Sequence, residues 1–274
     1  MHNRTTIKSL FLKGKSSFFG SARIADALRY VKSQTALDCI AREAIEVARD
    51  AWMLRERDLR NLASNVVLAL DVSPELHVVA HHYKSLKHDE SNADSDSATK
   101  TLIHAADRCP AEYTARIILA VGKARHGAGD HSEALRYYAE ACKSARGNDA
   151  LSRMYAVWNV AMVDYDCGLH RNGLSKFEGL FPLVSALSHR YPVLYYDYLN
   201  NLAALLSENG RIEESRHAIR IAMASPFADR FPEWRETQRE IEEAAHKQER
   251  TKSRAQQGTR PATRVRCSLK PSGA

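Results

Sequence analysis

Breaks in the helical pattern recur at nearly constant intervals along this chain. Between about residues 21 and 241, apolar side chains return every three or four positions, which is the periodicity of amphipathic helices. Turn-forming clusters divide this stretch, and we predict the turn within each helix pair at Asp58, Ala93, Gly129, Gly168 and Gly210. The intervals between these turns are 35, 36, 39 and 42 residues. One helix–turn–helix unit, repeated along the chain, therefore constrains the fold more than any other feature.

Small side chains recur in the same register around the turns. Gly129 is followed by Ala134, Tyr138 and Ala141 at steps of four and three residues. Equivalent trios follow the other turns: Ala63, Val67, Leu70; Ala98, Leu102, Ala105; Gly173, Phe177, Leu180; and Ser215, Ile219, Ala222. A further small residue comes seven positions before three of the turns, at Gly122, Ala161 and Ala203. Small residues let two helices approach closely, so these positions predict the crossing points within each hairpin.

This pattern resembles the tetratricopeptide repeat, and the resemblance covers about three quarters of the chain. Residues 115–146 match best, whereas residues 44–74 and 79–110 match loosely. The tryptophan that the family carries near the start of its first helix is replaced here by Ile118, Val157 and Leu199. Pro182 falls inside a predicted second helix, which it should kink or end. The alternative to repeats is a generic helical bundle with accidental periodicity.

The resemblance implies an all-α fold, namely a right-handed α-solenoid of about five hairpins with a capping helix at each end. We place the repeat domain at 21–246, with units near 44–74, 79–110, 115–146, 154–185 and 196–227 and a cap at 231–246. Pro232 suits the first turn of that cap, and Phe227, Phe231 and Trp234 should cover the last hairpin. A flexible basic leader at 1–20 and a disordered basic tail at 247–274 complete the prediction.

Charge is concentrated at the two ends of the chain. Residues 1–33 contain seven Lys/Arg and one acidic residue, and residues 244–274 contain eight Lys/Arg and one acidic residue. Residues 34–243 contain 25 Lys/Arg and 31 acidic residues. The net charge of +7 therefore does not describe the body, which is mildly acidic. Nucleic-acid binding cannot be argued from the overall charge, although the tails leave contact with nucleic acid open.

The resemblance also implies where a partner would bind. In such a stack the first helices line an inner, concave wall that suits a peptide or a helix. Exposed first-helix positions, with aromatic anchors, amides and cations, give the predicted partner-binding groove. Its residues are Arg116, Lys123, Tyr155, Trp158, Asn159, Met162, Tyr165, Asn200 and Asn201.

We therefore expect a non-catalytic scaffold that binds a protein or peptide partner and needs no cofactor. The alternative is a regulator that adds nucleic-acid contact through its basic tails, and an enzyme is the third possibility. The five cysteines include no C-x-x-C pair, and no apolar run approaches the roughly 20 residues of a membrane span, so we expect a cytoplasmic protein without a membrane span.

Two groups of chemically reactive residues do not change this expectation. His77, His81 and His82 have a spacing that can bind a metal, but no third ligand is signalled, so we predict no metal site. Cys142 and Cys167 fall on predicted helices in apolar surroundings and are expected to be core thiols.

Overall fold

The computed structural model describes residues 33–85, 95–145 and 149–258, and this part of the chain is all-α and contains no strand. The all-α prediction is confirmed. The helices are α3 (Gln34–Met53), α4 (Arg57–Ala69), α5 (Pro74–Ser85), α6 (Ser95–Arg108), α7 (Ala111–Gly127), α8 (His131–Ser144), α9 (Ala150–Asp166), α10 (His170–Gly179), α11 (Phe181–Ser188), α12 (Pro192–Glu208), α13 (Ile212–Met223) and α14 (Pro232–Gly258), with a short 3-10 turn η1 (Ala228–Arg230) before α14. The leader at 1–20, the predicted turn at Ala93 and residues 259–274 lie outside the described residues.

Local sequence signals explain where several helices begin. The side chains of Asp130 and Asp149 accept hydrogen bonds from the backbone N–H of Glu133 and Ser152, at 3.3 and 3.2 Å, and so cap α8 and α9. Proline opens α12 and α14, where its missing N–H costs nothing because the first turn has no partner for it.

Pro182 ends a helix, as the sequence predicts. α10 stops at Gly179, and Pro182 occupies the first turn of the separate helix α11. The unit predicted at 154–185 therefore contains a hairpin, α9 and α10, followed by an additional short helix. This insertion explains why the last interval between turns is the longest.

Four hairpins share the same three-residue turn. The middle residue of each turn has a positive φ, at Gly129 (78°), Gly168 (75°), Gly210 (75°) and Arg55 (55°). The first turn was predicted at Asp58, which is wrong: Asp58 lies in the first turn of α4, and Arg55 holds the turn position. The error arose because no glycine marks this turn. The trio predicted from Asp58 is nevertheless buried, since three residues are close to one helical turn and keep the same face inward.

The predicted small residues lie at the helix crossings. A Cβ on Gly122 would come within 2.5 Å of the Tyr138 ring on the second helix of its hairpin. A Cβ on Gly173 would meet the carbonyl oxygen of Ala161 at 2.9 Å. In the α12–α13 hairpin, the Ser215 hydroxyl donates a 2.6 Å hydrogen bond to the carbonyl of Ala203. Backbone and side chain therefore approach closely at equivalent places in three hairpins.

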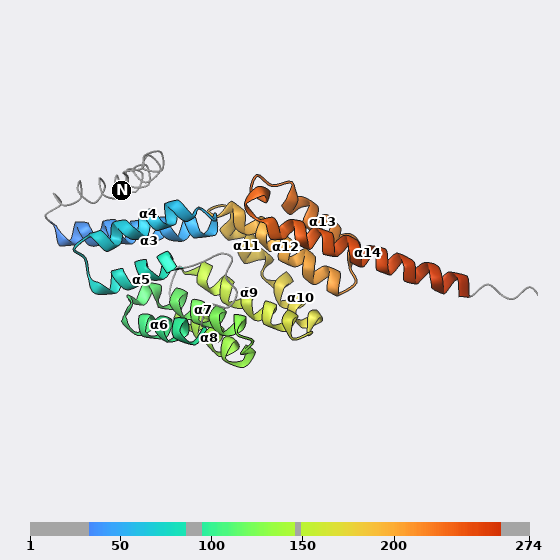
Figure 1. Cartoon of the computed structure of the whole chain (residues 1–274), viewed down its shortest axis with the longest axis horizontal. Coiled ribbons are helices and arrows are strands. Elements are labelled where there is room, and N and C mark those ends of the chain that lie inside the picture. Colours follow the sequence, from blue (N-terminus) through green and yellow to red (C-terminus); the bar gives the residue numbers. More distant parts are fainter. Residues whose placement is uncertain (1–32, 86–94, 146–148, 259–274) are drawn as a thin grey trace, which may run out of the picture.

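The helices pack largely in the order of the sequence. α3 pairs with α4, α7 with α8, α9 with α10 and α12 with α13, and the second helix of a hairpin then packs against the first helix of the next. α5 and α6 connect the first hairpin to the α7–α8 hairpin (Figure 1). α14 begins at Pro232, where a capping helix was predicted, and Phe231 and Trp234 are buried at its start, with ring centroids 4.6 Å apart.

Two segments that are far apart in the sequence meet. The turn between α3 and α4 lies against η1 and the first turn of α14, although about 175 residues separate them in sequence. From this junction α14 runs along α12 and α13 and then projects beyond the rest of the molecule (Figure 1). It continues to Gly258, past the boundary predicted at 246, because residues 247–258 are rich in helix-forming Lys, Arg, Glu and Gln.

Candidate functional site

The nine predicted groove residues all lie on the first helices of hairpins, but they differ in exposure. They come from α7, α9 and α12. Lys123 is exposed, and five residues are half-buried: Arg116, Tyr155, Met162, Tyr165 and Asn201. Trp158, Asn159 and Asn200 are buried, so the expectation of an exposed side chain fails for these three.

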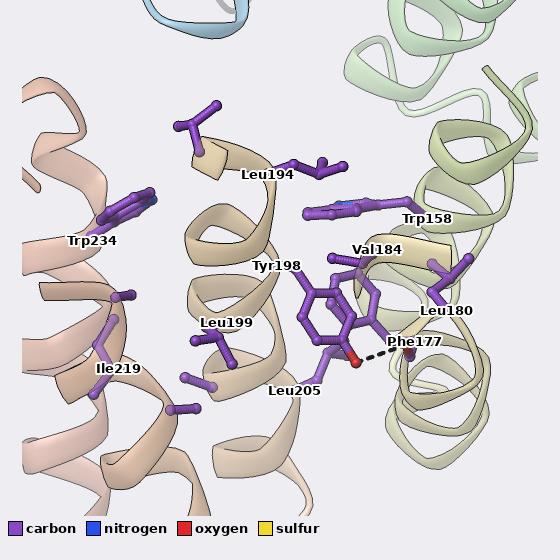
Figure 2. Close-up of a cluster of buried hydrophobic side chains, with 14 of the residues drawn as sticks. Trp158, Phe177, Leu180, Val184, Leu194, Tyr198, Leu199, Leu205, Ile219 and Trp234 are labelled. Carbon is purple, nitrogen blue, oxygen red and sulfur yellow. Dashed lines mark hydrogen bonds between the residues drawn. The ribbon is translucent and has the colours of Figure 1, made fainter. Parts of the chain in front are cut away.

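Trp158 belongs to the hydrophobic core. Its ring lies edge-on to Phe177, at a centroid distance of 4.8 Å, and 6.1 Å from the ring of Tyr198. Phe177 and Tyr198 stack on each other, and the Tyr198 hydroxyl donates a 3.2 Å hydrogen bond to the Phe177 carbonyl (Figure 2). An aromatic side chain enclosed in this way joins three helices and is not free to anchor a partner.

Two of the predicted amides are engaged with their own helices. Asn159 donates to the carbonyl of Tyr155 at 2.6 Å, and Asn201 donates to the carbonyl of Asp197 at 2.9 Å. Each bond reaches back one helical turn. These amides therefore offer fewer donors to a peptide backbone than the sequence suggested.

Helix α3, the first of the described helices, packs beside the predicted groove residues of α7. The carboxylate of Glu46 accepts a 2.7 Å hydrogen bond from Arg116 on α7 and also pairs with Arg49, one turn along α3. Burial alone would raise the pKa of Glu46, but the two guanidinium groups override it and hold the pKa below its ordinary value. Arg116, which the sequence assigns to a partner, thus already has a partner within the chain.

Lys123 is enclosed by aromatic rings from two helices. Its ammonium lies 5.2 Å from the ring centroid of Trp52 on α3 and 5.4 Å from that of Tyr155 on α9. These are cation–π distances. Although the residue is open to solvent, the protein around its ammonium lowers the pKa of Lys123, and the carboxylate of Asp197 opposes this.

The carboxyl group of Asp197 on α12 is largely shielded from water by the surrounding protein. Burial raises the pKa of Asp197 to about 6, and the carboxylate of Glu233 on α14 pushes it in the same direction. The indole of Trp234, the ammonium of Lys123 and the guanidinium of Arg55 favour the ionised form but do not prevail. The junction between the α3–α4 turn and the start of α14 therefore holds a carboxyl group whose pKa is about 6.

A cleft of about 440 Å³ opens between α3, α7, the start of α9 and the end of α11. Its size is within the range of ligand-binding pockets. Three arginines border it, Arg49, Arg116 and Arg190, together with Tyr191 and the acids Glu46, Glu112 and Asp149.

These charged groups are not equally available to a ligand. Arg49 is buried and donates a 2.7 Å hydrogen bond to the Tyr191 hydroxyl, besides its pairs with Glu46 and Asp50. Glu112 pairs with Arg42 on α3. Arg190 is exposed, and its guanidinium lies against the face of Tyr191, 5.1 Å from the ring centroid. Arg190 is thus the cation of the cleft that can take an anionic group without breaking an ion pair between described residues.

Sequence reasoning missed the contributions of α3 and α11 to this face. Arg49, Trp52, Arg190 and Tyr191 were not among the predicted residues, because the resemblance directs attention to the exposed positions of the better-matching units. Glu46 and Arg49 lie three residues apart on one face of α3, which predicts an ion pair between them. The second partner of Glu46, Arg116 on α7, is 70 residues away in the sequence and gives no such local signal.

Other reactive side chains do not assemble into a second site. His82 is buried and burial lowers its pKa to about 4, whereas the ring of His77 bonds the Leu70 carbonyl at 3.0 Å. Within the described ranges, no three His, Cys, Asp or Glu side chains are arranged to hold a metal ion. Cys167 is exposed, 3.6 Å from His131 Nδ1, so the expectation of a core thiol is wrong for this residue, which lies at the end of α9.

Comparison with known proteins adds no family to this picture. No protein-family model matches the sequence, and no curated protein matches it either. In the part of the chain that the structure covers, no helix has both the length and the apolar character needed to cross a membrane.

Proposed function

We propose that this chain is a tetratricopeptide-like scaffold, a right-handed α-solenoid that holds a segment of another protein on its inner face and catalyses no reaction. The four equivalent turns and the three close helix crossings support the repeat architecture. The packing of each hairpin against the next in sequence order supports it too.

The cleft bounded by Arg49, Arg116 and Arg190 is the observation that carries the binding proposal. It lies on the wall formed by first helices, and it is large enough to receive several side chains of a peptide. Arg190 is stacked on Tyr191 and pairs with no carboxylate of the described residues, so it favours an acidic side chain or a terminal carboxylate of the partner.

The structure changes which variants can test this proposal. Replacing Trp158 would remove a core side chain and unfold the protein, so loss of binding would be uninformative. Arg190→Glu alters an exposed residue at the cleft and reverses the charge that is available there. Arg171→Glu is the matched control, because Arg171 is exposed on α10, a helix that contributes no residue to the cleft.

The experiment is affinity capture from the native cell with the wild-type chain and the two variants, followed by mass spectrometry. We expect at least one protein to be retained by the wild type and by Arg171→Glu and lost with Arg190→Glu. Binding of that protein should then be reproduced with an acidic peptide from its own sequence. Identical protein lists for all three chains would rule out the cleft as the binding site.

A further inference from the structure

Arg55 has a backbone conformation that three equivalent turns give to glycine. Its φ is +55°, where an L side chain crowds the backbone, whereas the corresponding residues are Gly129, Gly168 and Gly210. Glycine adopts this conformation without strain. A strained residue is retained when its side chain has a role that glycine cannot fill.

The side chain of Arg55 reaches η1 and the start of α14. Its guanidinium lies over the ring of Phe231, 4.3 Å from the centroid, which is a cation–π contact. It also donates to the carbonyl of Arg230 at 3.3 Å and forms an ion pair with Glu233 in the first turn of α14. One side chain thus makes three contacts with a segment about 175 residues away.

A second arginine makes the reverse contacts. Arg230 in η1 donates to the carbonyl of Leu54 at 3.4 Å and pairs with the carboxylate of Glu56 at 3.2 Å. Leu54 and Glu56 are the residues on either side of Arg55. The polar contacts of the junction are therefore reciprocal, and apolar packing lies beside them, because Met53 belongs to the same core cluster as Phe231 and Trp234.

The end of α3 that this junction fixes also covers the inner face. Trp52 lies over Lys123 and 6.5 Å from Tyr155, edge to face, and Met53 is buried in the core cluster of the C-terminal helices. Both residues come immediately before the turn that carries Arg55. Any change that separates the turn from η1 and α14 therefore also releases Trp52 from its contacts with Lys123 and Tyr155.

We propose that Arg55, Glu56, Arg230, Phe231 and Glu233 form a latch that holds the α3–α4 turn against η1 and the start of α14, and that opening the latch uncovers the surface beneath Trp52. The closed state keeps Trp52 against Lys123 and Tyr155 and keeps Met53 buried, and the open state presents Tyr155 and Met53 to a partner. The second half of this proposal rests on the proposed function, whereas the latch itself does not.

The variant Arg55→Gly tests the latch contacts independently of the folding of the turn. Glycine suits the turn better than arginine, so α3 and α4 should stay folded, while all three contacts with η1 and α14 are lost. We expect hydrogen–deuterium exchange in residues 227–236 to accelerate about tenfold, with protection inside α3 and α4 unchanged. Arg57→Ala is the control, because Arg57 is exposed two residues further on and makes no ion pair with η1 or α14.

A charge reversal tests the pairing itself. Glu233→Arg should accelerate exchange in residues 227–236 as Arg55→Gly does, and Arg55→Glu combined with Glu233→Arg should restore most of the protection. Unchanged exchange in the single variants, or equal acceleration with Arg57→Ala, would overturn the latch. If the latch variants open the junction but retain no more partner than the wild type, gating is wrong while the scaffold proposal stands.

Discussion

Gly122 marks a place where a single methyl group has no room. An added Cβ would lie 2.5 Å from Cε1 of Tyr138, whose side chain is completely buried. We expect Gly122→Ala to lower the free energy of unfolding by about 1–3 kcal/mol, because the ring must move within a packed core. Gly127→Ala is the matched control on the same helix: no atom lies within 4 Å of its added Cβ, so stability should stay the same or rise slightly. Equal urea midpoints for the two variants would contradict the assigned crossing.

Individual residues also show what could be predicted from the sequence. Glycines and prolines act locally, so the turns at Gly129, Gly168 and Gly210 and the helix end at Pro182 were predictable. Arg55 was not, because its turn is stabilised by contacts with residues far along the chain. The burial of Trp158 was missed for a related reason: the resemblance gives the helix face, but not how tightly neighbouring helices close over it.

At the scale of an element, α12 carries a carboxyl group whose protonation affects stability. The pKa of Asp197 in the folded chain is about 6, above that of an unfolded aspartate, so the folded state binds the proton more tightly. Stability from this residue is present at low pH and is lost as pH rises from about 4 to about 6. We expect Asp197→Asn to stabilise the protein at pH 7 and to have little effect at pH 4, measured by urea unfolding.

Buried His82 on α5 affects stability in the opposite direction over the same pH range. Its folded pKa of about 4 is below the usual value, so its contribution is present above pH 6.5 and is lost as pH falls toward 4. The two effects partly cancel in the wild type, so the difference between wild type and Asp197→Asn isolates α12. An identical pH profile for both proteins would show that Asp197 titrates normally.

Prediction of whole elements succeeded where packing is local and failed where it is not. Hairpins α7–α8, α9–α10 and α12–α13 follow from periodicity and glycine spacing, because each pair packs within about 40 residues of sequence. α11 could be suspected only from Pro182 and the longer interval after Gly168. The position of α3 beside α7 depends on pairs such as Glu46 with Arg116 and Trp52 with Lys123, and no local sequence pattern predicts them.

At the scale of the whole molecule, the contact between the α3–α4 turn and the start of α14 should weaken as the salt concentration rises. The latch side chains are partly exposed, with 22% of Arg55, 40% of Glu233 and 45% of Arg230 accessible, so their ion pairs are screened by ions. The apolar contacts between successive hairpins are not weakened in this way. Raising NaCl from about 0.1 M to about 1 M shortens the screening distance from about 10 Å to about 3 Å. We expect this change to increase the exchange of residues 227–236 in the wild type and to have a smaller effect on Arg55→Gly, since that variant has lost the pair with Glu233 and keeps only the pair of Arg230 with Glu56. A salt response of equal size in both proteins would mean that salt acts on other parts of the protein. The α3–α4 turn would then be held against α14 by packing alone.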